Sequence, residues 1–338
     1  MRILAIGATG FIGRPTVVRL LAEGHTVWVV HRGQTTATLP ESVRSIHGER
    51  ASLAAYRSAL EPIAPDVVLD VIPYTEEQAS ALMALMRGLA GRVVALSSAD
   101  VYRNYEGFRG RSNPPPTPEL LAESAPLREH LYPYRDVEDL DVAYRATYDK
   151  ILVERAVLGE PTLPGTVLRL PAVYGEDDRQ RRLQPYLQRM RDHRPAILLG
   201  AAQARWRWSR GYVENVAAAI ALAVTDERAA NRIYNVADDP ALTEERWVQQ
   251  MAKAIEWQGA IRIVPDDALP PPLQQPFHWN YDLALDTRRI RTELGYREPV
   301  AWRAALERSI AWTADHEGDS QHPDYTAEDA VLARFGDA

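Results

Sequence analysis

Cysteine is absent from the 338-residue chain. Its absence excludes disulfide bonds, thiolate metal sites and a cysteine nucleophile. The eight histidines show no ligand spacing such as His-x-x-x-His, so the sequence predicts no metal site. No apolar run approaches the length of a membrane span. With a formal net charge of -7 and no long basic run, nucleic-acid binding has no electrostatic support. We therefore expect a cytoplasmic protein that contacts neither membrane nor nucleic acid.

A glycine-rich turn stands at the start of the chain. The apolar segment Ile3–Ile6 leads directly into Gly7, Gly10 and Gly13, and an apolar helix pattern follows. Such a turn lets the backbone approach a dinucleotide pyrophosphate, whose charge is favoured by the free N–H groups at a helix N-terminus. Three glycines alone are a weak signal, but together with this strand and helix they predict a nucleotide cofactor site.

Strand and helix patterns alternate around and after this turn. A helix pattern over residues 11–23 ends at Gly24, and a strand pattern follows at Thr26–Val30, which completes a β-α-β unit. Near-continuous apolar strands separated by amphipathic helices indicate an α/β fold, a doubly wound parallel sheet covered on both faces. Further strands are predicted at 43–48, 66–72 and 92–97, with helices at 51–61 and 75–89.

The residue composition and the strand–helix pattern of the chain change twice after the first hundred residues, and these changes suggest two lobes. We predict a dinucleotide-binding domain over residues 1–175, in which the polar, proline-rich segment 103–137 is a loop or lid, or equally a passive surface insertion. Residues 176–315 mainly form a smaller substrate lobe, with a short strand at Arg232–Val236. Residues 316–338 are expected to be a loosely held tail.

Several motifs occur in the order found in one enzyme family. They are Gly7-Ala-Thr-Gly10-Phe-Ile-Gly13, Leu96-Ser-Ser-Ala-Asp-Val-Tyr102, Leu168-Arg-Leu-Pro-Ala-Val-Tyr-Gly175, Arg210-Gly-Tyr-Val-Glu-Asn-Val-Ala217, Ile233-Tyr-Asn-Val236 and Leu294-Gly-Tyr296. The chain resembles an extended short-chain dehydrogenase/reductase of the NAD(P)-dependent epimerase/dehydratase kind. The resemblance implies a Rossmann fold with a smaller C-terminal substrate-binding lobe. It also implies cofactor contacts from Gly7, Thr9, Gly10, Phe11, Ile12, Gly13, Glu49, Lys150 and Pro171.

The chemistry that the resemblance implies needs three side chains. A tyrosine exchanges a proton, a lysine tunes the tyrosine and binds the nicotinamide ribose, and a serine or threonine orients the substrate oxygen. Ser98 matches the serine position and Lys150 the lysine position. The family spacing Tyr-x-x-x-Lys points to position 146, where this chain has Ala146. Tyr148 stands only two residues before Lys150, and in a regular helix the two would lie about 200° apart.

Three explanations of this departure remain open. In the first, the helix predicted over residues 139–158 begins instead near Thr147, as if two residues were deleted, so that Tyr148 lies in an irregular first turn, reaches the site and acts as the acid/base. In the second, another tyrosine donates the proton: Tyr102, Tyr132 or Tyr134. In the third, the protein has lost turnover and only binds the cofactor. The sequence does not choose among them, since catalytic groups are recognised by geometry.

The residue after the second strand bears on the choice of cofactor. Sites for NAD place an acidic residue there for the ribose 2′-hydroxyl, whereas an arginine accommodates the 2′-phosphate of NADP. The chain has Arg32 at this point and no acid. We therefore predict that NADP(H) is preferred and that NAD(H) is possible, although Arg32 can also be merely solvated.

A segment rich in arginine and tryptophan, residues 204–210, is a candidate for substrate binding. If it is extended, Arg205 and Arg207 share one face, and Trp206 and Trp208 share the other. An exposed charged strand packed by two core tryptophans is the plain alternative. We predict that four side chains contact the substrate: Tyr102, Arg205, Arg207 and Arg210.

These residues together indicate an NAD(P)-dependent oxidoreductase, epimerase or dehydratase. Its substrate is expected to be a small polar molecule with a reacting hydroxyl or carbonyl, such as a sugar derivative. Family members that act on nucleotide sugars tend to carry asparagine where this chain has Ala172, which weighs against a nucleotide sugar. The alternative is a sensor or scaffold that binds NADP(H) without turnover. The resemblance also suggests a homodimer.

Overall fold

A seven-stranded sheet forms the centre of the computed structural model, which describes residues 1–34, 39–316 and 323–335. All neighbouring strands pair in parallel, in the order β10-β6-β5-β4-β1-β2-β3. This is the doubly wound α/β sheet that the sequence predicts. The strands are β1 (Arg2–Ile6), β2 (Thr26–His31), β3 (Arg44–His47), β4 (Val67–Asp70), β5 (Arg92–Ser98), β6 (Gly165–Leu170) and β10 (Arg232–Asn235).

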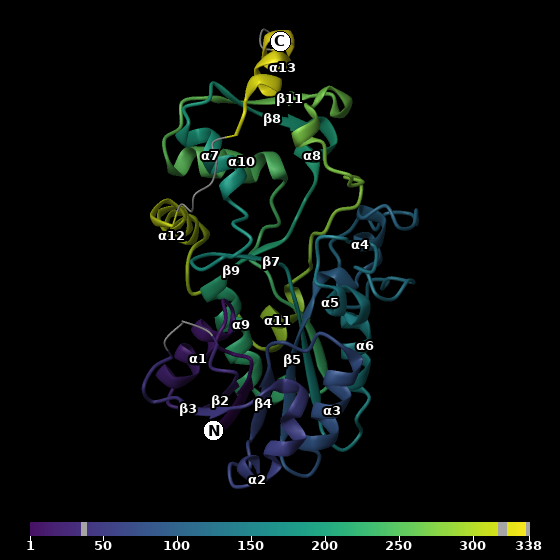
Figure 1. The fold of residues 1–338 in the computed structure, drawn as a ribbon, viewed down its shortest axis with the longest axis vertical. Coiled ribbons are helices and arrows are strands. Elements are labelled where there is room, and N and C mark those ends of the chain that lie inside the picture. Colours follow the sequence, from purple (N-terminus) through teal and green to yellow (C-terminus); the bar gives the residue numbers. More distant parts are fainter. Residues whose placement is uncertain (35–38, 317–322, 336–338) are drawn as a thin grey trace.

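Helices cover both faces of this sheet, as Figure 1 shows. α3 (Glu76–Met86) packs against α6 (Lys150–Leu158), and α1 (Gly13–Ala22) packs against α9 (Val213–Thr225). Alternate residues of β1 serve the two sides: Ile3 and Ala5 belong to one buried apolar cluster, and Leu4 and Ile6 to the other. Short elements between β3 and β4 are the 3-10 helix η1 (Arg50–Tyr56) and α2 (Arg57–Leu60).

The strand expected at Arg232–Val236 lies in a different place from the one predicted. It is β10, and it pairs with β6 at the edge of the large sheet rather than in the smaller lobe. Residues 213–236 therefore return to the dinucleotide-binding half. Their strand and helix patterns alone could not indicate this, because an edge strand reads alike in either lobe.

The smaller lobe is built on short parallel pairs of strands, and it forms the upper part of Figure 1. β8 (Ala196–Gly200) pairs with β11 (Ala260–Val264), and β7 (Ala172–Tyr174) pairs with β9 (Arg210–Tyr212). The helices of this half and of the C-terminal region are α7 (Gln184–Arg191), α8 (Ala201–Arg205), α10 (Glu244–Ala254), α11 (Arg288–Glu293) and α12 (Trp302–Asp315). Three further 3-10 helices are η3 (Glu227–Ala229), η4 (Asp266–Ala268) and η5 (Pro271–Leu273).

The C-terminal region departs from the loose tail that we predicted. Residues Thr326–Phe335 form helix α13, at the top of Figure 1. Glu328 is buried and forms a two-point ion pair with Arg189 of α7, at 2.5 and 3.0 Å. Val331 packs against the apolar cluster of the smaller lobe. Ion pairing and a few apolar side chains hold this helix against the lobe. So few apolar residues in a polar segment do not produce a recognisable helix pattern in the sequence.

The proline-rich segment 103–137 is tied to the smaller lobe at several points. It begins with α4 (Arg103–Phe108), where the sequence predicted a loop. The amide of Asn104 donates to the carbonyls of Thr117 and Asp282, and the Leu121 N–H donates to the Ala284 carbonyl at 2.8 Å. The segment thus joins the two halves of the molecule along one side.

Candidate functional site

The glycine-rich turn between β1 and α1 has the shape that a dinucleotide requires. Gly7 has a φ of +71°, a conformation that residues with a Cβ rarely adopt. A Cβ on Gly13 would stand 2.4 Å from the Ala8 Cα, so the close approach of helix and strand requires glycine there. A Cβ on Gly10, in contrast, would meet no protein atom within 4 Å. The open side of the turn at Gly10 therefore fits a pyrophosphate at the α1 N-terminus.

The other predicted cofactor residues surround this turn or lie along the same sheet edge. Phe11 and Ile12 are half-buried against the apolar cluster beside α1, and Thr9 is buried. Arg32 and Glu49 are exposed, directly after β2 and shortly after β3. An exposed guanidinium at this position is accessible to a phosphate.

A buried ion pair stands at the same edge of the sheet. Asp70, the last residue of β4, is 1% exposed. Arg50 pairs with both of its carboxylate oxygens. The Asp70 charge is therefore satisfied within the protein and needs no ligand.

The helix predicted over residues 139–158 is broken in the middle. α5 (Val142–Thr147) ends before Tyr148, and α6 begins at Lys150. Tyr148 and Asp149 between them have extended backbone conformations. In an extended segment residues i and i+2 point to the same side. The break therefore brings Tyr148 and Lys150 together, although a regular helix would place them apart.

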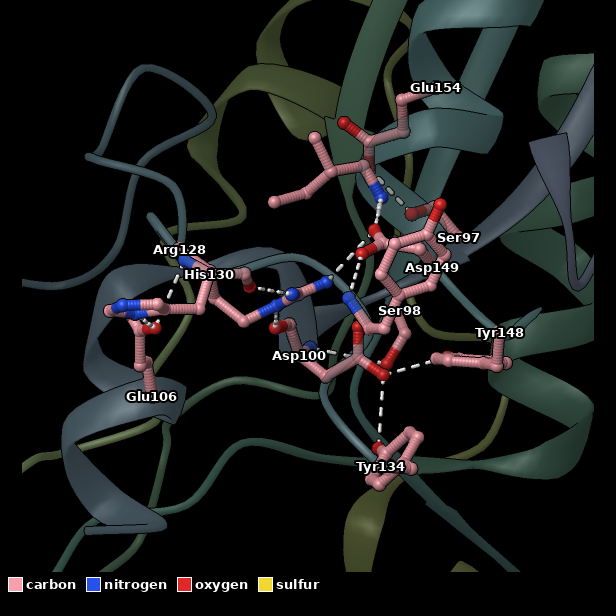
Figure 2. Close-up of polar contacts among 12 residues, drawn as sticks. Ser97, Ser98, Asp100, Glu106, Arg128, His130, Tyr134, Tyr148, Asp149 and Glu154 are labelled. Carbon is pink, nitrogen blue, oxygen red and sulfur yellow. Dashed lines mark hydrogen bonds and ion pairs between the residues drawn. The ribbon is translucent and has the colours of Figure 1, made fainter. Parts of the chain in front are cut away.

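Two buried side chains hold this break in place. The Asp149 carboxylate caps α6 by accepting from the Ile151 N–H at 2.8 Å, and it also accepts from the Tyr132 N–H at 2.5 Å. The Arg128 guanidinium, from segment 103–137, forms an ion pair with Asp149 at 3.1 Å. Both side chains are at most 1% exposed. Figure 2 shows this pair beside the tyrosines of the site.

Tyr148 is buried, and its hydroxyl donates to Asp100 Oδ2 at 2.7 Å (Figure 2). Tyr134 donates to the same oxygen at 3.1 Å. Burial raises the pKa of Tyr148 well above its usual value, and the neighbouring Asp100 charge raises this pKa further. Tyr148 is accordingly a neutral phenol.

Lys150 lies on the other side of Tyr148. Its Nζ donates to the carbonyls of Pro73 and Leu96, at 2.8 and 2.9 Å, and stands 5.8 Å from the centre of the Tyr148 ring. Burial lowers the pKa of Lys150 to about 8. A cation at this distance favours the phenolate that forms when Tyr148 gives up its proton.

Ser98 ends strand β5 at the carboxyl edge of the sheet, where open α/β folds bind their ligands. Its Oγ accepts from the Asp100 N–H at 3.2 Å and so caps the 3-10 helix η2 (Ala99–Val101). Local hydrogen bonds of this kind are common for serine at the start of a helical turn. Ser98 also lines the cavity described next, so its hydroxyl can serve both purposes.

A cavity of about 630 Å³ connects this edge of the sheet to the smaller lobe. Ser98, Asp100 and Tyr148 line it together with Pro171 and several aromatic residues. The volume suits a small-molecule substrate.

The predicted substrate residues fall in different places. Arg210 lines the cavity and pairs with Glu244. Arg205 is exposed at the end of α8, and Arg207 pairs with Asp282 at 2.7 Å; neither lines the cavity.

The prediction of one extended segment over residues 204–210 was wrong at its start, because α8 runs to Arg205. Trp206 and Trp208 line the cavity instead of the arginines.

Tyr102 is also outside the cavity. It is fully buried, and its hydroxyl donates to Asn235 at 2.6 Å and accepts from Arg169 at 3.0 Å. Arg169 in turn forms a two-point ion pair with Glu154, at 2.9 and 2.7 Å. Tyr102 thus belongs to a buried polar network, which removes it from the candidate proton donors and substrate contacts.

Asp100 is the residue of the site that the sequence analysis missed. It is 4% exposed, and its Oδ1 accepts no hydrogen bond from the described residues. An unpartnered carboxylate oxygen in a cavity is a marker of function. The sequence could have indicated this residue, because Asp100 is an acid two residues after Ser98 and directly follows a largely apolar strand.

A sequence profile of the NAD dependent epimerase/dehydratase family matches residues 3–237, which is more than half of the chain. The chain belongs to this family. Its turn, sheet and broken Tyr148–Lys150 segment are therefore those of an atypical member of the epimerase/dehydratase family.

Two curated relatives of this epimerase/dehydratase family member are reductases. A 2'-dehydrokanamycin reductase of Streptomyces kanamyceticus is 28% identical over 70% of the chain and 62% of its own length. The chain therefore spans less than two thirds of that relative. A 3-diazoavenalumate denitrifying reductase of a Streptomyces species is 28% identical over 91% of the chain and 100% of its own length.

The same fold occurs among solved structures of related enzymes. The dTDP-glucose 4,6-dehydratase of Streptomyces venezuelae, solved with NAD bound, superposes with a TM-score of 0.66 at 21% identity, over 94% of this chain and 98% of that one. Among the described residues of our chain, no group of three or more His, Asp or Glu side chains could hold a metal ion. No helix in the described ranges has the length and apolar character needed to cross a membrane.

Proposed function

We propose that the protein is an NADP(H)-dependent reductase of a carbonyl group on a small molecule, with Tyr148 as the proton donor. The observation that carries this proposal is that Ser98 and Tyr148 line one cavity on the carboxyl edge of the sheet, with the buried Lys150 Nζ 5.8 Å from the centre of the Tyr148 ring. The two reductase relatives support reduction as the reaction.

Each side chain has a separate task in this reaction. The bound dinucleotide supplies the hydride that reduces the carbonyl carbon. The Ser98 hydroxyl donates to the carbonyl oxygen and fixes its position. The Tyr148 hydroxyl then gives its proton to that oxygen, so the carbonyl becomes an alcohol. Lys150 holds the nicotinamide ribose and balances the charge left on Tyr148.

The environment of Tyr148 keeps its hydroxyl protonated, which is the state in which a reductase meets its carbonyl substrate. Oxidation of an alcohol would need a phenolate to accept the proton. Burial and the Asp100 carboxylate both raise the pKa of Tyr148, which keeps it protonated. A protonated donor is what reduction requires at the start of the cycle.

Arg32 supports the choice of NADP(H). It is exposed directly after β2, followed by Gly33, whose φ is +73°. A permanent positive charge at this position favours a 2′-phosphate. NAD(H) is the alternative, since the dehydratase of the same fold binds NAD.

A protein that only senses the cofactor is the second candidate. Its support was the missing Tyr-x-x-x-Lys spacing. The broken helix weakens that support, because it brings Tyr148 and Lys150 to one side. The cavity at Tyr148 also favours turnover, since a sensor needs no second pocket beside the cofactor.

The test compares Tyr148→Phe with Tyr134→Phe. Both variants lose one hydrogen bond to Asp100 Oδ2, but only the first loses the proposed proton donor. Carbonyl compounds are screened by loss of NADPH absorbance, and both variants are assayed on whichever is reduced. We expect kcat to fall by about 10²–10⁴-fold in Tyr148→Phe with NADPH affinity unchanged, and by much less in Tyr134→Phe.

The opposite order would make Tyr134 the donor. Equal activity of the wild type and Tyr148→Phe would remove Tyr148 from the mechanism. Tight NADPH binding without turnover of any carbonyl would favour the sensor.

A further inference from the structure

Five aromatic side chains form one wall of the cavity, which we call the aromatic wall. Phe108 stacks on Trp206 with ring centres 4.8 Å apart and planes 4° from parallel, and on Phe277 at 4.4 Å. Trp279 meets Trp206 edge-on at 5.1 Å, and Trp208 lies 5.2 Å from Trp206. All five line the cavity, and they come from α4, from the segment before β9 and from residues 277–279.

The aromatic wall is fixed before any ligand binds. The Trp206 indole N–H donates to the Tyr281 carbonyl at 2.8 Å, and the Tyr281 hydroxyl donates to the Pro114 carbonyl at 2.7 Å. These contacts tie the wall to segment 103–137. Because the wall is already ordered, little conformational entropy of the protein is lost when a ligand ring binds to it. The apolar area that the ring buries therefore contributes more fully to affinity.

The charges of the cavity are mostly neutralised within the protein. Four arginines line it, and three are paired with carboxylates: Arg182 with Asp178 at 2.7 Å, Arg189 with Glu328, and Arg210 with Glu244. Only Arg109 has no carboxylate partner within the described ranges, and its guanidinium lies 5.7 Å from the centre of the Phe277 ring. Among the residues that the structure describes, the cavity therefore offers one guanidinium without a carboxylate partner.

A single such guanidinium does not suit a nucleotide diphosphate. A diphosphate carries at least two negative charges, and a protein meets them with several charge-assisted hydrogen bonds. Drawing on the paired arginines would break ion pairs that are largely buried, which is unfavourable. Three rings of the aromatic wall, Trp208, Phe277 and Trp279, are partly exposed, and their surfaces suit a planar apolar group.

We propose that the substrate carries its reactive carbonyl on an aromatic ring system with at most one negative group, and is not a nucleotide sugar. The ring lies against the aromatic wall, the carbonyl faces Ser98 and Tyr148, and the single negative group meets Arg109. This inference rests on the proposed function, because it names the substrate class of the same site.

The test measures binding without turnover. Isothermal titration of the protein saturated with NADP⁺ is carried out with trans-cinnamaldehyde and, separately, with UDP-glucose. Trp279→Leu and Phe277→Leu each remove one ring of the aromatic wall. Trp312→Leu is the matched control, since Trp312 stacks on His316 and does not line the cavity. We expect cinnamaldehyde to bind about tenfold more weakly to the two wall variants and unchanged to the control.

Several results would overturn the inference. One is tighter binding of UDP-glucose than of cinnamaldehyde. Another is an affinity for cinnamaldehyde that is unchanged in both wall variants. Binding of neither probe at millimolar concentration would also overturn it, because the wall would then lack affinity for a bare ring. Failure to bind NADP⁺ would instead contradict the proposed function, and titration of cofactor-free protein would still test the wall.

Discussion

The ion pair between Arg128 and Asp149 is expected to hold the break between α5 and α6. Replacing Asp149 by alanine removes the helix cap, which costs about 1 kcal/mol. It also leaves the Arg128 charge buried without a carboxylate, which costs about 3–5 kcal/mol. Both side chains are at most 1% exposed, so solvent cannot compensate. The free energy of unfolding should therefore fall by about 4–6 kcal/mol, a large part of the about 5–15 kcal/mol of a typical protein.

Urea unfolding measures this loss, and Asp141→Ala is the matched control. Asp141 caps α5 by accepting from the Tyr144 N–H at 2.9 Å, but it is exposed. Its replacement should cost only about 1 kcal/mol.

A double variant, Arg128→Met with Asp149→Asn, separates the stranded charge from the lost contacts. It should be more stable than Asp149→Ala, because no charge remains buried and asparagine can still cap α6. If Asp149→Ala costs no more than Asp141→Ala, or if the double variant is the least stable of all, this explanation of the break is wrong.

Three further predictions concern the cofactor site. Arg32→Ala should weaken NADPH binding by about tenfold or more and leave NADH binding within about twofold, as measured by titration. Lys150 has its pKa lowered from 10.5 to about 8, so the unfolded chain binds more protons between these values. Relative to Lys150→Met, the wild type should gain up to about 3 kcal/mol of unfolding free energy from pH 8 to 10.5, measured by urea unfolding. Gly13→Ala would drive a Cβ into the Ala8 backbone and should lower both the melting temperature and dinucleotide affinity, whereas Gly88→Ala, which meets no atom within 4 Å, tests the strain of a positive φ alone.

The central sheet could be predicted from the sequence because its signals are local and strong. Strands β1, β4 and β5 are continuous apolar runs, and the glycines at 7 and 13 are required by the backbone itself. The placement of β10 and the docking of α13 depend on partners far away in the chain, which no local pattern encodes. The aromatic wall was hidden for the same reason, since Phe108, Trp206 and Trp279 meet only in the fold.

The break between α5 and α6 brings a tyrosine and a lysine together without the Tyr-x-x-x-Lys spacing. The motif works because residues one helical turn apart share a face. An extended pair of residues followed by a helix start achieves the same result with a spacing of two. Such a break leaves backbone groups at the helix ends without intrahelical partners. Asp149 accepts from one of them, the Ile151 N–H, and Arg128 holds Asp149 in place through an ion pair.

Loss of the standard spacing is therefore weak evidence for loss of catalysis in this family. A stronger sign would be loss of the groups that hold the break. In this chain those groups, Asp149 and Arg128, are present and buried, and Arg128 lies in segment 103–137, which also supplies Tyr134 and Phe108 to the cavity. The segment that positions Tyr148, the proposed proton donor, thus also shapes the cavity, so changes in it should alter turnover and specificity together.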